Sequence, residues 1–205
     1  PLVAVSEGLW LDFLALLSTP TLNLDAFLAL CSQAVSVLPL SGRLWAVYLR
    51  AITRCQRPKS HMLALYEKAA HSRGVALLGG ASLLSLLQAR IDCERAYAAM
   101  ELAHAQKKSP DQVLVVTEMD HFMHVYELFL HSISAMQRLP ASEQDASVAL
   151  ERCAVDWIER ASRALAQTAG LEASAGLYPL ADDVWTHALE QHPMHATASV
   201  SYTHL

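Results

Sequence analysis

Residues that interrupt helices are scarce in this chain. Its 205 residues include only seven glycines and eight prolines, and β-branched residues are few beside leucine and alanine. Strands favour β-branched and aromatic residues, whereas leucine and alanine are among the strongest helix formers. The composition therefore excludes a protein built mainly of β-sheet and predicts an all-α fold.

An excess of positive charge is also missing. The chain has 15 basic and 20 acidic residues and a formal net charge of −5. This balance argues against a basic nucleic-acid surface that extends over the whole chain. A local basic strip is still possible, and it would consist of Arg50, Arg54, Arg57 and Lys59.

Long apolar runs and paired cysteine motifs are absent as well. Asp12, Pro20 and Asp25 interrupt the hydrophobic N-terminal part, so we predict no membrane-spanning segment. The four cysteines are widely spaced: Cys31, Cys55, Cys93 and Cys153. This spacing predicts reduced, mostly buried thiols of an intracellular protein and no zinc site.

What the chain does contain is an internal repeat. The stretch 9–14, Leu-Trp-Leu-Asp-Phe-Leu, returns 35 residues later at 44–49 as Leu-Trp-Ala-Val-Tyr-Leu. The same offset relates Leu30 to Leu65 and Ala34 to Ala69. A repeat of this length indicates helical hairpins that must stack, because each is too small to bury its own apolar face.

The apolar periodicity predicts about eight helices in four hairpins. The first two hairpins span about 3–38 and 41–74, with Asp25 and Ser41 as expected caps of the helices that follow them. The third has long helices over about 82–106 and 112–136. In the fourth, Trp157 lies on the first helix and the second begins near Pro179.

Aromatic residues within these helices have two possible roles. In the first helix they belong to an apolar stripe formed by Leu9, Trp10, Phe13, Leu14 and Leu17. Their helical spacing among leucine and alanine predicts that they pack in the core between hairpins. Alternatively, the four tryptophans could form a stacking platform for single-stranded RNA.

The pattern of these hairpins resembles the HAT (half-a-TPR) repeat family. In that family a Trp and an aromatic residue three positions later are followed by an alanine-rich helix that ends near proline. The stretches 64–70 and 181–189 are similar to the second helix of such a repeat. The residues that match the repeat signature are Trp10, Phe13, Trp45, Tyr48, Tyr66, Glu67, Ala69, Trp157, Trp185, Ala188 and Pro193.

The resemblance implies a right-handed α-solenoid over 1–196, followed by a tail, 197–205, that is foreign to the fold. Because the chain starts at Pro1, we expect it to be a fragment of a longer protein. HAT proteins are nuclear scaffolds of RNA processing. The resemblance therefore implies a protein that is not an enzyme, has no cofactor and acts in pre-mRNA splicing. Its implied partners are snRNP proteins, a deubiquitinating enzyme and a second copy of the chain, with RNA contact indirect or weak.

Two other functions are compatible with the sequence. The chain could be a HAT scaffold of pre-mRNA 3′-end cleavage or of the U1 snRNP. It could instead be a helical bundle that binds a metal or a small ligand, because His121 and His124 lie near Glu118 and Glu127 on one predicted helix. The simpler interpretation of these polar residues is a solvated stripe, opposite an apolar face of Met119, Phe122, Met123 and Tyr126.

Overall fold

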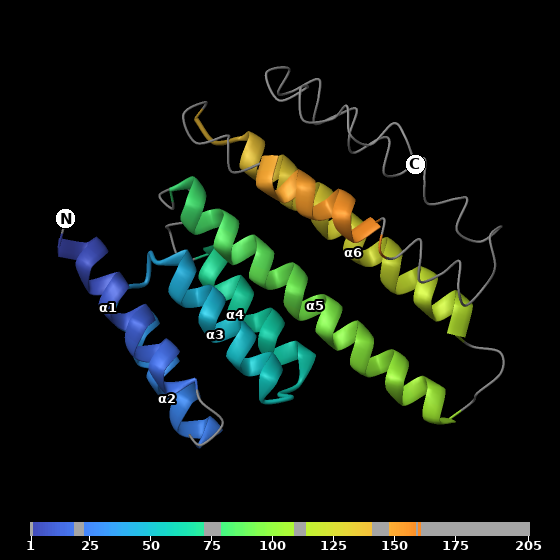
Figure 1. Cartoon of the computed structure of the whole chain (residues 1–205), viewed down its shortest axis with the longest axis horizontal. Helices are drawn as coiled ribbons and strands as arrows, with labels where there is room; N and C mark the ends of the chain where they lie inside the picture. The colour runs from blue at the N-terminus through green and yellow to red at the C-terminus, as the bar shows by residue number, and fades with distance from the viewer. Residues whose placement is uncertain are drawn as a thin grey trace. The chain divides into compact units, whose positions relative to one another are not determined.

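The computed structural model describes residues 2–18, 23–71, 79–108, 114–140, 148–158 and 160, and within them every regular element is a helix. The helices are α1 (Leu2–Leu17), α2 (Leu24–Val37), α3 (Gly42–Arg54), α4 (Lys59–His71), α5 (Gly80–Lys108) and α6 (Leu114–Gln137), with a further helical stretch over 148–158 (Figure 1). The predicted all-α class is confirmed. The helix expected after Pro179, and the 197–205 tail, lie outside these residues.

Contacts divide the chain into two compact units, Pro1–Ala103 and His104–Leu205, with the boundary near the end of α5. None of the described helices combines the length and apolarity that crossing a bilayer requires. Whether 1–196 forms one solenoid domain stays a prediction.

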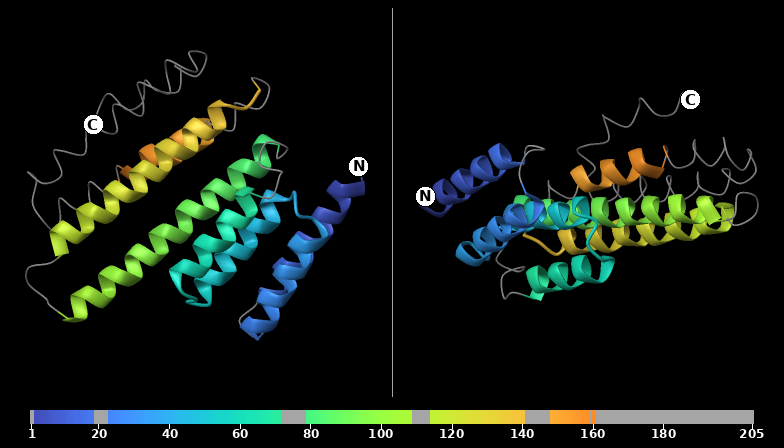
Figure 2. Two further views of the ribbon diagram at one scale, coloured as in Figure 1. Left: turned by 180° about the vertical axis from the view of Figure 1, so that it is seen from behind. Right: turned by 90° about the horizontal axis from the view of Figure 1, so that it is seen from below.

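The first unit contains two helical hairpins. α1 contacts α2, and α3 contacts α4, while α2 also packs on α3 (Figures 1 and 2). The connections between the helices of each hairpin are short, which makes their helices antiparallel neighbours. α3 is the central helix of the two hairpins, since it contacts α1, α2 and α4. Its residues Leu44, Leu49 and Ile52 are therefore completely buried.

The start of α2 differs from the predicted one. Asn23, not Asp25, is the N-cap, because the Asn23 side chain accepts a hydrogen bond from the backbone N–H of Asp25 at 2.9 Å. Asp25 instead lies in the first turn of α2, where its negative charge suits the positive end of the helix dipole. Its carboxylate forms an ion pair with Arg57.

The start of α3 agrees with the prediction, since Ser41 is its N-cap. Ser41 Oγ accepts a hydrogen bond from the backbone N–H of Leu44 at 3.1 Å and donates one to Glu7 Oε1 of α1. The next residue, Gly42, donates its backbone N–H to Ser82 Oγ at 2.8 Å. A Cβ atom on Gly42 would lie only 2.1 Å from the carbonyl oxygen of Ser82. Glycine is thus what allows α3 to begin so close to α5.

The second unit has an aromatic core between α6 and the helical stretch 148–158. The rings of Phe122 and Trp157 are stacked with centroids 4.7 Å apart, and Phe129 lies 5.6 Å from Trp157. Phe122 also stacks on Tyr126. Offset or tilted arrangements at these distances are favourable for aromatic pairs. Trp157 is therefore a core residue, as its helical spacing predicted, and its ring is not displayed for base stacking.

Candidate protein-binding surface

The sequence repeat corresponds to a repeat of helices. α4 begins at Lys59, 35 residues after α2 begins at Leu24. Equivalent positions on the paired helices are buried together: Leu14 with Leu49, Phe27 with Met62, and Ala34 with Ala69. The two hairpins therefore use the same positions to form the core of the first unit.

The aromatic pair of the repeat also recurs. Trp10 and Phe13 meet edge to face with centroids 6.1 Å apart, and Trp45 and Tyr48 are 6.5 Å apart. Trp45 is buried, and its Nε1–H donates to the backbone oxygen of Pro39 at 2.8 Å. Tyr48 and Trp10 are half-buried. Trp45 thus has the predicted core position with its polar atom satisfied.

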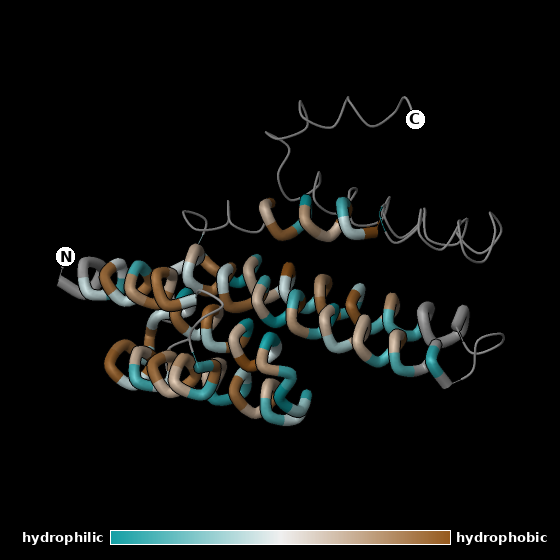
Figure 3. Tube along the Cα trace, turned by 60° about the horizontal axis from the view of Figure 1, so that its bottom comes forward, coloured by the Kyte–Doolittle hydropathy of each residue, from teal (hydrophilic) through white to brown (hydrophobic). Residues whose placement is uncertain are grey.

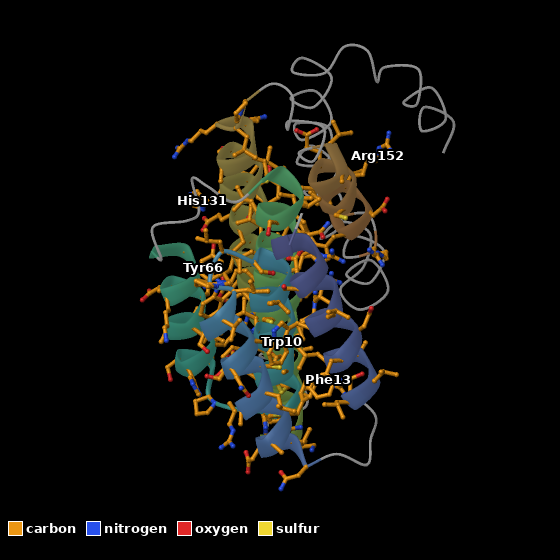
Figure 4. All side chains as sticks on the ribbon, turned by 90° about the vertical axis from the view of Figure 1, so that its left-hand side faces the viewer. Trp10, Phe13, Tyr66, His131 and Arg152 are labelled. Carbon is orange, nitrogen blue, oxygen red and sulfur yellow. The ribbon has the colours of Figure 1, made fainter. Side chains whose placement is uncertain are left out.

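The apolar stripe predicted for the first helix is mostly not buried in the core, so this prediction is corrected. Of the residues in that stripe, only Leu14 is buried; Leu9 is 66% exposed and Phe13 is 44% exposed. The equivalent of Leu9 in the second hairpin, Leu44, is completely buried. The physical reason is that α3 has neighbours on several sides, whereas α1 contacts α2 and α3 through the side that carries Leu14. Figure 4 shows the side chains of this end of the first unit, with Trp10 and Phe13 labelled.

Three of the exposed large apolar side chains of the described surface lie on α1, and the sequence prediction did not identify this exposed side. Leu16 is 75% exposed and lies on the same side as Leu9 and Phe13. A signal for it was present, because α1 carries only two charged residues, Glu7 and Asp12. Figure 3 shows apolar residues recurring along this helix. A helix that is apolar on nearly every side needs more cover than one neighbouring hairpin supplies.

Three further signature residues, Tyr66, Glu67 and Ala69, lie on α4. The Arg90 guanidinium lies 4.6 Å from the ring centroid of half-buried Tyr66, a cation–π contact. Burial raises the pKa of Tyr66, and the Arg90 charge opposes that rise. Glu67 is exposed and Ala69 is buried. The remaining signature residues, Trp185, Ala188 and Pro193, lie outside the described part of the chain.

The candidate basic strip is largely neutralised by carboxylates. Its ion pairs are Arg50 with Asp92, Arg57 with Asp25, and Lys59 with Glu94. An RNA phosphate would have to displace these carboxylates, which lowers the electrostatic gain from binding. Arg54 is exposed. The strip is therefore a weak candidate for a nucleic-acid surface.

One carboxylate, Glu94, is buried between two cations. Its side chain is 1% exposed, with Lys59 Nζ at 2.9 Å and Arg90 Nη2 at 2.8 Å. Burying charges is costly, so a buried carboxylate normally has close, well-oriented partners, as here. Because Lys59 starts α4 and Glu94 lies in α5, the cluster holds these two helices together. Its geometry suits a structural role, since both carboxylate oxygens face a cation.

The buried thiols are poorly suited to nucleophilic chemistry. Burial, reinforced by the nearby Cys55, raises the pKa of Cys31 to about 12, and burial also raises the pKa of Cys93. Nucleophilic cysteines need a lowered pKa, because the thiolate is the reactive form. None of the four cysteines forms a disulfide, but Cys153 is exposed and Cys55 half-buried. The prediction of mostly buried thiols therefore holds for only two of the four.

The histidine pair on α6 is split between two environments. His124 and Glu127 are exposed, as a solvated stripe requires, whereas His121 is half-buried. In the described ranges no group of His, Cys, Asp or Glu side chains has the arrangement of a metal site. Met123, expected on the apolar face, is 39% exposed, because it lies one position beyond buried Phe122 and so points about 100° away from it.

Comparisons of the chain with protein-family models, with curated proteins and with solved structures found no match. Support for a function therefore comes from the sequence repeat and from the packing of the helices. Among the features above, the exposed side of α1 is the best candidate for a functional surface.

Proposed function

We propose that the chain is a non-catalytic protein–protein interaction scaffold of RNA processing, built as a right-handed α-solenoid of HAT-type hairpins. The observation that carries this proposal is the correspondence between the 35-residue sequence repeat and two adjacent helical hairpins with matching buried positions. Stacked hairpins of this kind form extended surfaces whose main use is to bind other macromolecules.

The proposal places the protein in the nucleus, in pre-mRNA splicing. This part of the proposal rests on a resemblance over about 30–196 between the order of segments and that of the splicing factor that recycles U4/U6 snRNPs, also described as a squamous-cell-carcinoma antigen recognised by T cells. Its partners are then snRNP proteins, a deubiquitinating enzyme and a second copy of the chain. Contact with RNA is then indirect or weak, which agrees with the carboxylates that already pair with Arg50, Arg57 and Lys59.

Affinity capture of the full-length protein from nuclear extract, followed by mass spectrometry, tests this function. We expect U4/U6 snRNP components among the captured proteins. A bait carrying Leu49→Asp is the matched control, because it places a charge at a fully buried position of α3 and should lose fold-dependent partners. Recovery of 3′-end cleavage factors or of U1 components instead would contradict the U4/U6 role and favour the alternative HAT scaffolds.

A metal analysis of the purified full chain tests the non-catalytic part of the proposal. Metal at stoichiometric occupancy would contradict a pure scaffold and favour the metal-binding helical bundle. We expect substoichiometric metal that a chelator removes without a change in the helical circular dichroism signal.

A further inference from the structure

Four exposed residues of α1 form one continuous face, which we name the α1 outer face: Leu9, Asp12, Phe13 and Leu16. Their spacing is i, i+3, i+4 and i+7, which places them on one side of a helix. The three apolar members are 66%, 44% and 75% exposed, and Asp12 is exposed among them. The face is thus apolar with a carboxylate at its middle.

The internal repeat indicates that this kind of face is normally covered by another helix. Leu44, the equivalent of Leu9, is completely buried, and Tyr48, the equivalent of Phe13, is half-buried within the contacts of α3. The other acidic residue of α1, Glu7, already has partners in Ser41 and Arg43 of the second hairpin. The α1 outer face therefore has the composition of a surface that packs against another helix, but no described helix covers it.

Asp12 indicates what the second helix must contain. None of the ion pairs among the described side chains involves Asp12. A contact that covers Leu9, Phe13 and Leu16 would also remove Asp12 from water, and an unpaired buried carboxylate is strongly unfavourable. A second copy docked about a two-fold axis at this face would bring two Asp12 carboxylates together. The charge therefore favours a different partner that supplies a cation.

We propose that the α1 outer face binds an amphipathic helix of a partner protein whose apolar residues have i, i+3/i+4, i+7 spacing and flank a Lys or Arg that pairs with Asp12. This inference rests on the proposed scaffold function and specifies the class of partner. Helix-in-groove recognition of this kind uses apolar anchors for affinity and charge pairs for register and specificity.

Site-specific photocrosslinking in the full-length protein tests the proposal. Phe13 is replaced by p-benzoylphenylalanine, whose ring is similar in shape, and crosslinked peptides from nuclear extract are sequenced by mass spectrometry. The matched control carries the same group in place of Leu130, which is 38% exposed on α6. We expect the Phe13 position, and not the Leu130 position, to capture a segment with the stated apolar spacing and a central Lys or Arg.

Charge exchange then tests the role of Asp12. Asp12→Lys should lower the yield of that crosslink about fivefold or more, which is the size of effect expected when an attractive interfacial pair becomes repulsive. Replacing the central Lys or Arg of the partner helix with Glu should restore the yield of the crosslink to the Asp12→Lys variant. Leu16→Gln should lower the yield about tenfold, whereas Leu130→Gln should leave it unchanged. Far-UV circular dichroism checks that each variant stays helical.

Three results would overturn the proposal: a crosslink to a second copy of the chain, a captured segment whose yield is insensitive to Asp12→Lys, or no crosslinked product. These outcomes are independent of the affinity capture. If U4/U6 components are recovered equally with the wild-type and Leu16→Gln baits, the α1 outer face is not their binding site while the scaffold function stands. If the basic helix is captured but comes from another machinery, the interface stands and the U4/U6 role fails.

Discussion

At the residue scale, we expect two glycines of the first unit to have opposite effects on stability when each is replaced by alanine. A Cβ on Gly42 would meet the Ser82 carbonyl oxygen at 2.1 Å, whereas Gly8 has open space around its Cβ position. We expect Gly42→Ala to lower the free energy of unfolding by about 1–3 kcal/mol, because the starts of α3 and α5 must move apart. Gly8→Ala should raise it by up to about 1 kcal/mol, because alanine favours the helix.

Urea unfolding followed by circular dichroism measures both changes, and Gly8→Ala controls for the added methyl group. Equal stabilities of the two variants would contradict the close approach of α3 to Ser82. The sequence alone gives no reason to separate these glycines, since the difference arises from a contact between residues 40 positions apart.

Cys31 makes stability depend on alkaline pH. Burial raises its pKa from 9.0 to about 12 in the folded chain. Below pH 9 the thiol is protonated in both states; between pH 9 and about 12 only the unfolded chain loses the proton, so the free energy of unfolding falls as the pH rises. The slope from this group is on the order of 1 kcal/mol per pH unit.

Urea unfolding at several pH values between 8 and about 11 measures this slope. Cys31→Ala should reduce the slope relative to the wild type. Cys153→Ala is the control, because Cys153 is exposed and its replacement should leave the slope unchanged. The same slope in all three proteins would show that the Cys31 thiol titrates normally.

At the scale of single elements, α4 and α5 are joined by a charged cluster. Replacing Glu94 with Gln leaves Lys59 and Arg90 without their buried anion, and these side chains are 32% and 15% exposed. We expect Glu94→Gln to lower the free energy of unfolding by about 1–3 kcal/mol, less than for a fully buried pair because both cations reach water.

The matched control is Glu67→Gln on α4, which removes an exposed carboxylate and should change stability by less than about 0.5 kcal/mol. Chemical unfolding of the three proteins gives the comparison. A Glu94→Gln variant as stable as Glu67→Gln would mean that α4 and α5 are held by apolar contacts alone.

The N-caps of α2 and α3 show how accurately helix starts can be predicted from the local sequence. Ser41 was predicted as a cap because a small hydroxyl residue precedes an apolar helix, and its Oγ does accept the Leu44 N–H. Asp25 carried the same kind of signal, yet Asn23 is the cap. Both side chains can cap a helix, so composition alone could not choose the first residue of α2. The position of each helix was therefore predictable to within a few residues, but its exact first and last residues were not.

At the scale of the whole molecule, the proposed solenoid makes an elongated particle. A compact chain of 205 residues would have a radius of gyration of about 17 Å. We expect small-angle X-ray scattering of the purified chain, at concentrations where it is monomeric, to give a clearly larger value and an asymmetric distance distribution. A value near that of the compact chain would contradict the solenoid and favour a closed bundle.

The sequence by itself determined that the chain is helical, where most helices lie and which positions recur after 35 residues, because leucine, alanine, caps and periodicity act locally. Only the tertiary structure decided which recurring positions are buried. Leu9 and Leu44 occupy the same place in the repeat, yet one is 66% exposed and the other fully buried. Burial depends on which neighbours a helix has, and neighbours are set by packing between distant segments. For the same reason the partners of Arg50, Arg57 and Lys59 were visible only in the folded chain.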